Sequence, residues 1–151
     1  MAFERRLLTK KVQQVAEGIA PVGLLDIPPN VGWNSQSTNT QSTKFRPFAI
    51  LTPGSASVLN TGGYSRDEND WRCTYTLASY GVSVDQTELV ADSMRNAIEK
   101  MTSTRLVLEN NYLVQQVRVS NVGSVQSVNT ADLPYYLQLD TYEIWISKEM
   151  Q

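Results

Sequence analysis

Histidine is absent from this chain of 151 residues, and cysteine occurs once, as Cys73. A single cysteine excludes an intramolecular disulfide, so packing alone must hold the fold together. Without histidine, a Ser-His-Asp or Cys-His hydrolase site is excluded, and a zinc site would need an almost all-carboxylate set of ligands. We therefore expect no metal or other cofactor.

Long apolar runs and a broad excess of positive charge are also missing. The apolar runs span only a few residues, as at positions 48–51, far short of the roughly 20 residues that cross a bilayer. The basic residues near the N-terminus are not followed by the apolar segment of a signal peptide. The formal net charge is -2 and the sequence pI is about 5.1. These features argue against a membrane span, secretion and dedicated nucleic-acid binding.

The composition is that of a folded protein. Hydrophobic residues make up 41% of the chain and charged residues 19%, which disfavours wholesale disorder. A chain of this length can bury about two-thirds of its unfolded surface. We expect one domain that spans residues 1–151.

Two segments have the apolar period of an amphipathic helix. Residues 3–19 form the first, and Gly18 and Pro21 predict that it ends near position 19 or 20. Residues 85–101 form the second, which a capping pair introduces: Ser83 with Gln86, or Asp85 with Glu88. The apolar stripes are Leu8, Val12, Val15 and Ile19 in the first segment, and Val90, Met94, Ala97, Ile98 and Met101 in the second.

Alternation of apolar and polar residues predicts the strands. The strongest signal covers residues 71–82, where Trp71, Cys73, Tyr75 and Leu77 share one phase. Cys73 on this phase is expected to be a core residue. Further strands are expected at residues 48–51, 105–108, 112–120, 125–128 and 135–147.

The connections between these strands carry their own expectations. We expect a turn at Pro53-Gly54 and another at Asn121 and Gly123, and a hairpin formed by two of the strands at 105–108, 112–120 and 125–128. The apolar phase changes near Asp140-Thr141, which predicts a bulge or a bend in the final strand. The fold class is therefore α+β, a mostly antiparallel sheet with two main helices on one face.

A long loop is expected after the N-terminal helix, over residues 21–47. It includes four prolines and a polar tract at 34–43 without apolar periodicity. Loops of this length are uncommon in compact domains unless they are functional or disordered. Trp33 in this loop either folds back onto the core or contacts another chain, and contact is the alternative we favour.

No set of residues forms a recognisable catalytic or nucleotide site. Asp67, Glu68 and Asp70 could act as paired carboxylates, but they share a polar turn with Arg66, and solvated charges are the simpler interpretation. The glycine pairs match no phosphate-binding pattern. We therefore expect that the chain is not an enzyme.

The order of elements resembles that of phage tail terminator and related neck proteins. An amphipathic N-terminal helix precedes a strand at 71–82 that runs directly into a helix at 85–101, and an alternating strand at 135–147 ends the chain. The similarity covers residues 3–20 and 45–147.

The resemblance implies a structural virion protein that forms a ring, usually of six subunits. Such a ring caps the tail tube and joins it to the head connector or a head-completion protein, with DNA only as passing cargo. It assembles in the host cytoplasm and performs no catalysis.

Residues for contacts with partners are chosen from expected exposure. The candidates are Arg5, Arg6, Lys10, Lys11, Trp33, Arg66, Asp67, Glu68 and Asp70. Two alternatives stay open. One is another neck or tail component, such as a head-completion protein or a tail tube subunit. The other is a small-ligand or peptide-binding domain, with Trp33, Tyr64, Tyr80 and Trp145 lining a pocket.

Overall fold

A six-stranded sheet forms the centre of the molecule. The computed structural model describes residues 4–33, 45–58, 70–102, 112–128 and 134–148. The strands are β1 (Val22–Leu24), β2 (Phe48–Val58), β3 (Asp70–Gly81), β4 (Tyr112–Val122), β5 (Gln126–Val128) and β6 (Tyr135–Lys148). They lie in the order β1-β2-β3-β6-β4, and β5 also pairs with β6. Only the pair β1–β2 is parallel.

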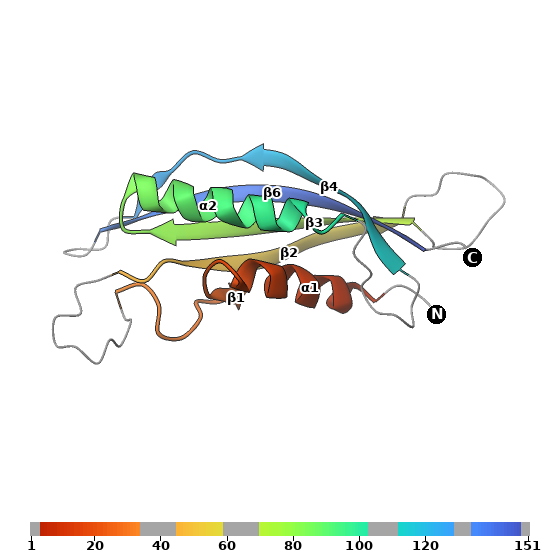
Figure 1. Ribbon diagram of the computed structural model, residues 1–151, viewed down its shortest axis with the longest axis horizontal. Coiled ribbons are helices and arrows are strands. Elements are labelled where there is room, and N and C mark those ends of the chain that lie inside the picture. The colour runs from red at the N-terminus through yellow and green to blue at the C-terminus, as the bar shows by residue number, and fades with distance from the viewer. Residues whose placement is uncertain (1–3, 34–44, 59–69, 103–111, 129–133, 149–151) are drawn as a thin grey trace.

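Two helices, α1 (Arg5–Glu17) and α2 (Val84–Glu99), lie on the same side of this sheet (Figure 1). Helix α2 contacts β3, β6 and β4, whereas α1 contacts β1, β2 and α2. The prediction of an α+β fold with two helices on one face of a mostly antiparallel sheet is confirmed.

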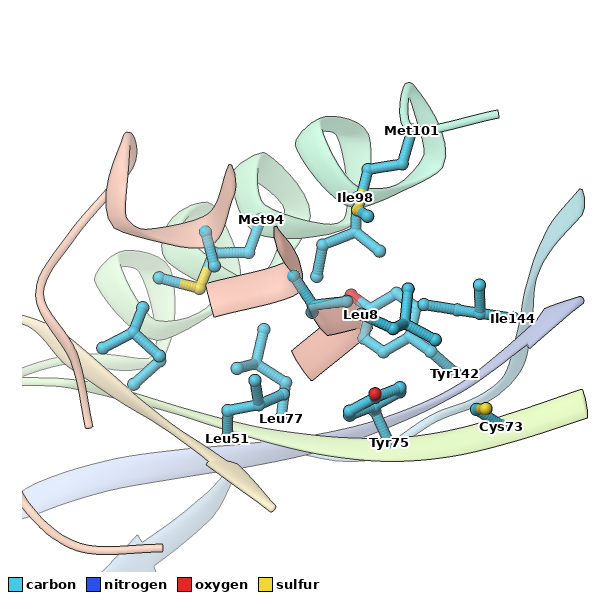
Figure 2. Close-up of a cluster of buried hydrophobic side chains, with 14 of the residues drawn as sticks. Leu8, Leu51, Cys73, Tyr75, Leu77, Met94, Ile98, Met101, Tyr142 and Ile144 are labelled. Carbon is cyan, nitrogen blue, oxygen red and sulfur yellow. The ribbon is translucent and has the colours of Figure 1, made fainter. Parts of the chain in front are cut away.

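The main hydrophobic core lies between the helices and the sheet. Figure 2 shows Met94 and Ile98 of α2 pointing toward the sheet, with Leu8 of α1 close to Tyr142 of β6. Cys73 is buried in the same cluster, as expected. Burial raises the pKa of its thiol to about 11, which is typical of an inert core cysteine.

A second, smaller cluster lies on the face of the sheet without helices. Because side chains alternate along a strand, Phe48 and Ile50 of β2 point away from the helices that Ala49 and Leu51 face. Phe48 stacks on Tyr80 of β3 with ring centroids 4.5 Å apart. The cluster consists of Val31, Phe45 and Phe48, with Trp33, Ile50, Tyr80 and Tyr135 packed against it.

The N-terminal part of the chain differs from the sequence prediction in two ways. Helix α1 ends at Glu17, and Ile19 is 43% exposed, so the buried stripe runs through Leu8, Val12 and Ala16 instead. Residues 22–24 form the short parallel strand β1 inside the predicted loop. A run of three residues is too short to show a period, so its pairing with β2 was not readable from the sequence.

Strand β2 continues through Pro53-Gly54, where we expected a turn. Its register against β3 shifts between Pro53 and Ala56, so the dipeptide forms a bulge rather than a turn. Proline lacks the N–H that a regular ladder uses, and a bulge accommodates this. A side chain at Gly54 would collide with the hydroxyl of Thr74.

The turn expected at Asn121 and Gly123 does not join β4 and β5 in a hairpin. Strands β4 and β5 pair one after the other with β6, not with each other. The register of β6 against β3 is continuous through Asp140, so the predicted bulge is also wrong. The register shifts lie in β4 instead, at Val114/Gln116 and Val119/Asn121. The expected strand at 105–108 lies outside the described residues.

Candidate interaction surfaces

A groove with a basic rim lies where α1 meets the β1 edge of the sheet. The basic groove has a volume of about 450 Å³ and lies between α1, Leu24-Leu25 and the bulge of β2. Its cationic side chains are Arg5, Arg6 and Lys10, and no carboxylate lines it. Arg5 donates to the carbonyl of Gly54, which ties α1 to the bulge.

Hydrogen bonds fix the floor of the basic groove. Gln13 Nε2 donates to the carbonyl oxygen of Val22 at 3.1 Å, which holds α1 against β1. The hydroxyls of Thr9 and Tyr75 share a buried hydrogen bond of 2.9 Å, which holds the helix on the sheet. Arg6 and Lys10 are exposed at the rim, where the guanidinium of Arg6 pairs with the exposed carboxylate of Glu4 at 3.2 Å.

The apolar part of the basic groove is unusual in its backbone. Leu25 is 68% exposed and has a φ of 63°, in the left-handed region that costs an L-residue roughly 1–2 kcal/mol. Its amide donates to the carbonyl of Leu51 at 3.0 Å, which holds it there. The exposed apolar side chain on this strained backbone makes Leu25 a candidate for contact with a partner.

A second pocket lies near the opposite edge, between α2 and the segment that joins β4 to β5. This acidic pocket has a volume of about 410 Å³ and includes Glu88, Asp92 and Arg95 of α2 together with Gly123 and Gln138. Asp140 of β6 lies behind this lining and is 1% exposed. Its Oδ1 accepts from Gln138 Nε2 at 3.0 Å and from the Gly123 amide at 3.3 Å.

Arg95 connects Asp140 to the surface. Its guanidinium lies 3.3 Å from Asp140 Oδ2 and 2.9 Å from Asp92 Oδ1. Burial disfavours the charged form of Arg95, but the attraction of the two carboxylates outweighs it, so the pKa of the guanidinium is raised. The carboxylate of Asp140 is thus satisfied by a guanidinium, an amide side chain and a backbone N–H, whereas the buried Nε of Arg95 has no hydrogen-bond partner among the described residues.

The structure brings only some of the predicted interface residues together. Arg5, Arg6 and Lys10 share the basic groove, whereas Lys11 on the same helix is half-buried and does not line it. Asp70 begins β3, away from that groove and opposite Ser147 in the register. The predicted candidates Arg66, Asp67 and Glu68 lie outside the described residues. A role in contacts stays a prediction for all of them.

Trp33 and the aromatic residues of the alternative pocket are not gathered in one place. Trp33 packs edge-on against Phe45 with centroids 5.5 Å apart, in the second cluster that also includes Tyr80. Trp145 pairs with Arg72 near the start of β3, whereas Tyr80 is near its end. Tyr64 lies outside the described residues. The described residues therefore do not place the aromatic side chains of the ligand-binding alternative in one pocket.

Asp140 and Arg95 were not among the residues that the sequence predicted to form a site. Asp140 lies two residues before Tyr142, on the phase that continues through Ile144 and Ile146 to the core. A carboxylate on a buried phase was the available signal, because it needs a cationic partner. We instead interpreted the exposed Leu139 as the core phase, which produced the wrong bulge.

The part of the chain that the structure describes bears on two further classes of site, metal centres and membrane spans. There, no group of three or more cysteine, aspartate or glutamate side chains could hold a metal ion. No helix in that part is both long and apolar enough to span a bilayer.

Comparisons with known proteins do not assign a family. No family model matches the sequence, and no curated protein does. Solved structures do align with the chain. One of them covers 95% of this chain and 96% of its own, at 12% identity and a TM-score of 0.38. At that identity and TM-score, the similarity identifies neither a family nor a function.

Proposed function

We propose that this chain is a phage tail terminator, a structural virion protein that forms a ring of about six subunits. The ring caps the tail tube when its growth ends and joins it to the head connector. DNA passes through the ring, and the mildly acidic chain, with a net charge of -2, suits that passage because carboxylates repel phosphates.

The observation that carries the proposal is the arrangement of the sheet edges. Strand β1 lies at one edge, and β4 and β5 lie at the other. Within the described residues, β1 pairs with β2 alone. Open edges are a liability in a monomer but suit repeated contacts between copies. A heterologous contact of this kind stops growing only when its rotation closes a ring.

The junction of β3 and α2 supports the resemblance to the terminator family. Only Val82 and Ser83 separate the strand from the helix. A Cβ at Gly81 would meet Thr87 Oγ1 at 2.6 Å, so the absence of a side chain allows the close approach. The strand therefore passes almost directly into the helix, as the resemblance leads us to expect.

The test combines the mass of the protein in solution with its effect on tail tubes. Light scattering after size exclusion, over a range of concentrations, should give an oligomer, either alone or with tubes. Added to growing tubes, the protein should bind their ends and stop elongation. A tube subunit would instead lengthen the tubes, and a head-completion protein would bind connectors without them. A monomer that leaves tube ends unbound contradicts the proposal.

A further inference from the structure

The two surfaces at opposite edges of the sheet have opposite charge. Arg5, Arg6 and Lys10 line the basic groove, and the ion pair of Arg6 with Glu4 is exposed, so solvent screens it and a partner's carboxylate can compete for the guanidinium. Glu88 and Asp92 lie on the rim of the acidic pocket, and Asp85 is exposed one turn earlier on α2. Asp92 is compensated by Arg95, so Asp85 and Glu88 carry the excess charge that a cationic surface would attract.

Both surfaces also expose large apolar side chains beside the charges. Leu25, whose backbone is in the left-handed conformation, lines the basic groove. On α2, Leu89 is 64% exposed between Glu88 and Val90. An apolar centre with a charged rim is the usual composition of a protein interface. Leu25 lies beside the cations of the basic groove. Leu89 is outside the lining of the acidic pocket but lies one turn from Asp85 and one turn from Asp92 on α2. The two apolar side chains therefore have charges of opposite sign beside them.

We propose that the basic groove of one copy receives the first two turns of α2 from a second copy. This inference rests on the proposed ring and names its head-to-tail contact. In it, Arg6 and Lys10 face Asp85 and Glu88 of the neighbour, and Leu25 packs against the neighbour's Leu89.

The positions of the two surfaces make this contact heterologous. The basic groove lies at the β1 edge, and the acidic pocket lies beside β4 and β5 at the other end of the strand order. Figure 1 shows α1 and β1 on the opposite side of the molecule from β4. A copy that uses its groove therefore keeps its acidic surface free for the next copy. Such contacts repeat until the ring closes.

Charge reversal on each surface tests the contact. The double variant R6E/K10E presents two acidic surfaces, and D85K/E88K presents two basic ones. Each variant alone places like charges in the interface, so its self-association should be at least about tenfold weaker than that of the wild type. Mixed in equal amounts, the two variants are complementary at both edges. Light scattering should then show oligomers of alternating subunits, which also demonstrates that both variants are folded.

The control is K11E/K100E, which changes the net charge as much as R6E/K10E but lies outside both surfaces. It should associate like the wild type. Raising the salt from about 0.1 M to about 0.5 M should weaken wild-type association, because the charges are exposed. Circular dichroism checks that the variants keep the secondary structure of the wild type.

The outcomes separate this contact from the proposed function. If R6E/K10E and D85K/E88K associate like the control, or if their mixture stays monomeric, the contact is overturned while a terminator ring could still stand. If the wild type oligomerises through these surfaces but leaves tubes growing, the proposed function fails and the contact stands. If the wild type is monomeric until it meets a tube, the readout of the mixing assay becomes the elongation of tail tubes. Neither variant alone should then stop elongation, whereas the mixture should. A wild type that is monomeric with and without tubes overturns both.

Discussion

Asp140 illustrates how a buried carboxylate depends on one cationic partner beside its neutral hydrogen-bond donors. Its side chain is almost fully buried and bonds Arg95, which is 20% exposed. We expect Asp140→Asn to lower the free energy of unfolding by about 1–3 kcal/mol, because the guanidinium loses its buried counter-charge while the shape is kept. Urea unfolding followed by circular dichroism measures the loss.

Asp92 is the matched control because it pairs with the same guanidinium. Its side chain is 59% exposed, so solvent screens the pair. Asp92→Asn should change the free energy of unfolding by less than about 0.5 kcal/mol. Equal losses for both variants would contradict the structural role given to Asp140.

Alkaline pH should destabilise the fold through groups that are buried in their neutral form. Burial raises the pKa of Cys73 from 9.0 to about 11 and the pKa of Tyr75 from 10.0 to about 12. The folded state therefore keeps protons that the unfolded state releases. The stability that the burial of these two groups contributes is fully present below pH 9, and it is lost progressively as pH rises through 11 and 12.

Unfolding in urea at a series of pH values measures this dependence. In the double variant C73A/Y75F, neither group can ionise, so the fall in unfolding free energy above pH 9 should become shallower. The readout is the slope against pH, so a constant loss from either substitution does not affect it. An unchanged slope in the variant would reject these two residues as its cause.

At the scale of elements, the start of α2 is held by two reciprocal hydrogen bonds. Ser83 Oγ accepts from the Gln86 amide at 3.1 Å, and Gln86 Oε1 accepts from the Val82 amide at 2.8 Å. Ser83→Ala should lower the free energy of unfolding by about 1 kcal/mol because an amide of the first turn loses its acceptor. Thermal or urea unfolding measures it.

Ser124→Ala is the control for the cap, since Ser124 is exposed between β4 and β5. It should change the free energy of unfolding by no more than about 0.5 kcal/mol. A loss for Ser83→Ala no greater than this would show that water replaces the cap without cost.

The same cap shows which parts of the fold were predictable. Capping and period are local, so the sequence predicted α2 from Ser83 and strand β3 from the alternation around Cys73. Pairing between strands is not local. The choice of β6 rather than β4 as the partner of β5 depends on register over the whole sheet, and no turn signal at Gly123 expresses it.

The candidate surfaces, too, were predictable from the sequence only in their local parts. Arg5, Arg6 and Lys10 were predicted as contact residues because they are clustered in sequence on one helix. The rest of the basic groove comes from Leu24-Leu25 and Pro53-Gly54, which only the parallel pairing of β1 with β2 brings to α1. The acidic pocket likewise needs α2 beside the segment that follows β4, a proximity that no local pattern encodes.

At the scale of the whole molecule, fold stability and assembly should place opposite demands on the β1 edge. The left-handed backbone of Leu25 disfavours the monomer, while its exposed side chain is the proposed apolar contact of the basic groove. Asn30 has a similar φ of 58° but is a residue type that tolerates it. Asn30 is thus a residue type that suits its left-handed backbone, whereas Leu25 is a residue type that suits contact with a partner.

Leu25→Asn should therefore separate the two properties. The free energy of unfolding of the dilute monomer should stay equal or rise by up to about 1 kcal/mol, because asparagine accepts the left-handed conformation. Self-association, measured by light scattering, should weaken because the apolar contact is lost. The reverse change, Asn30→Leu, should lower the free energy of unfolding by about 1 kcal/mol through strain. If Leu25→Asn were destabilising and left association intact, Leu25 would serve the fold, and the strain at this edge would have no function in assembly.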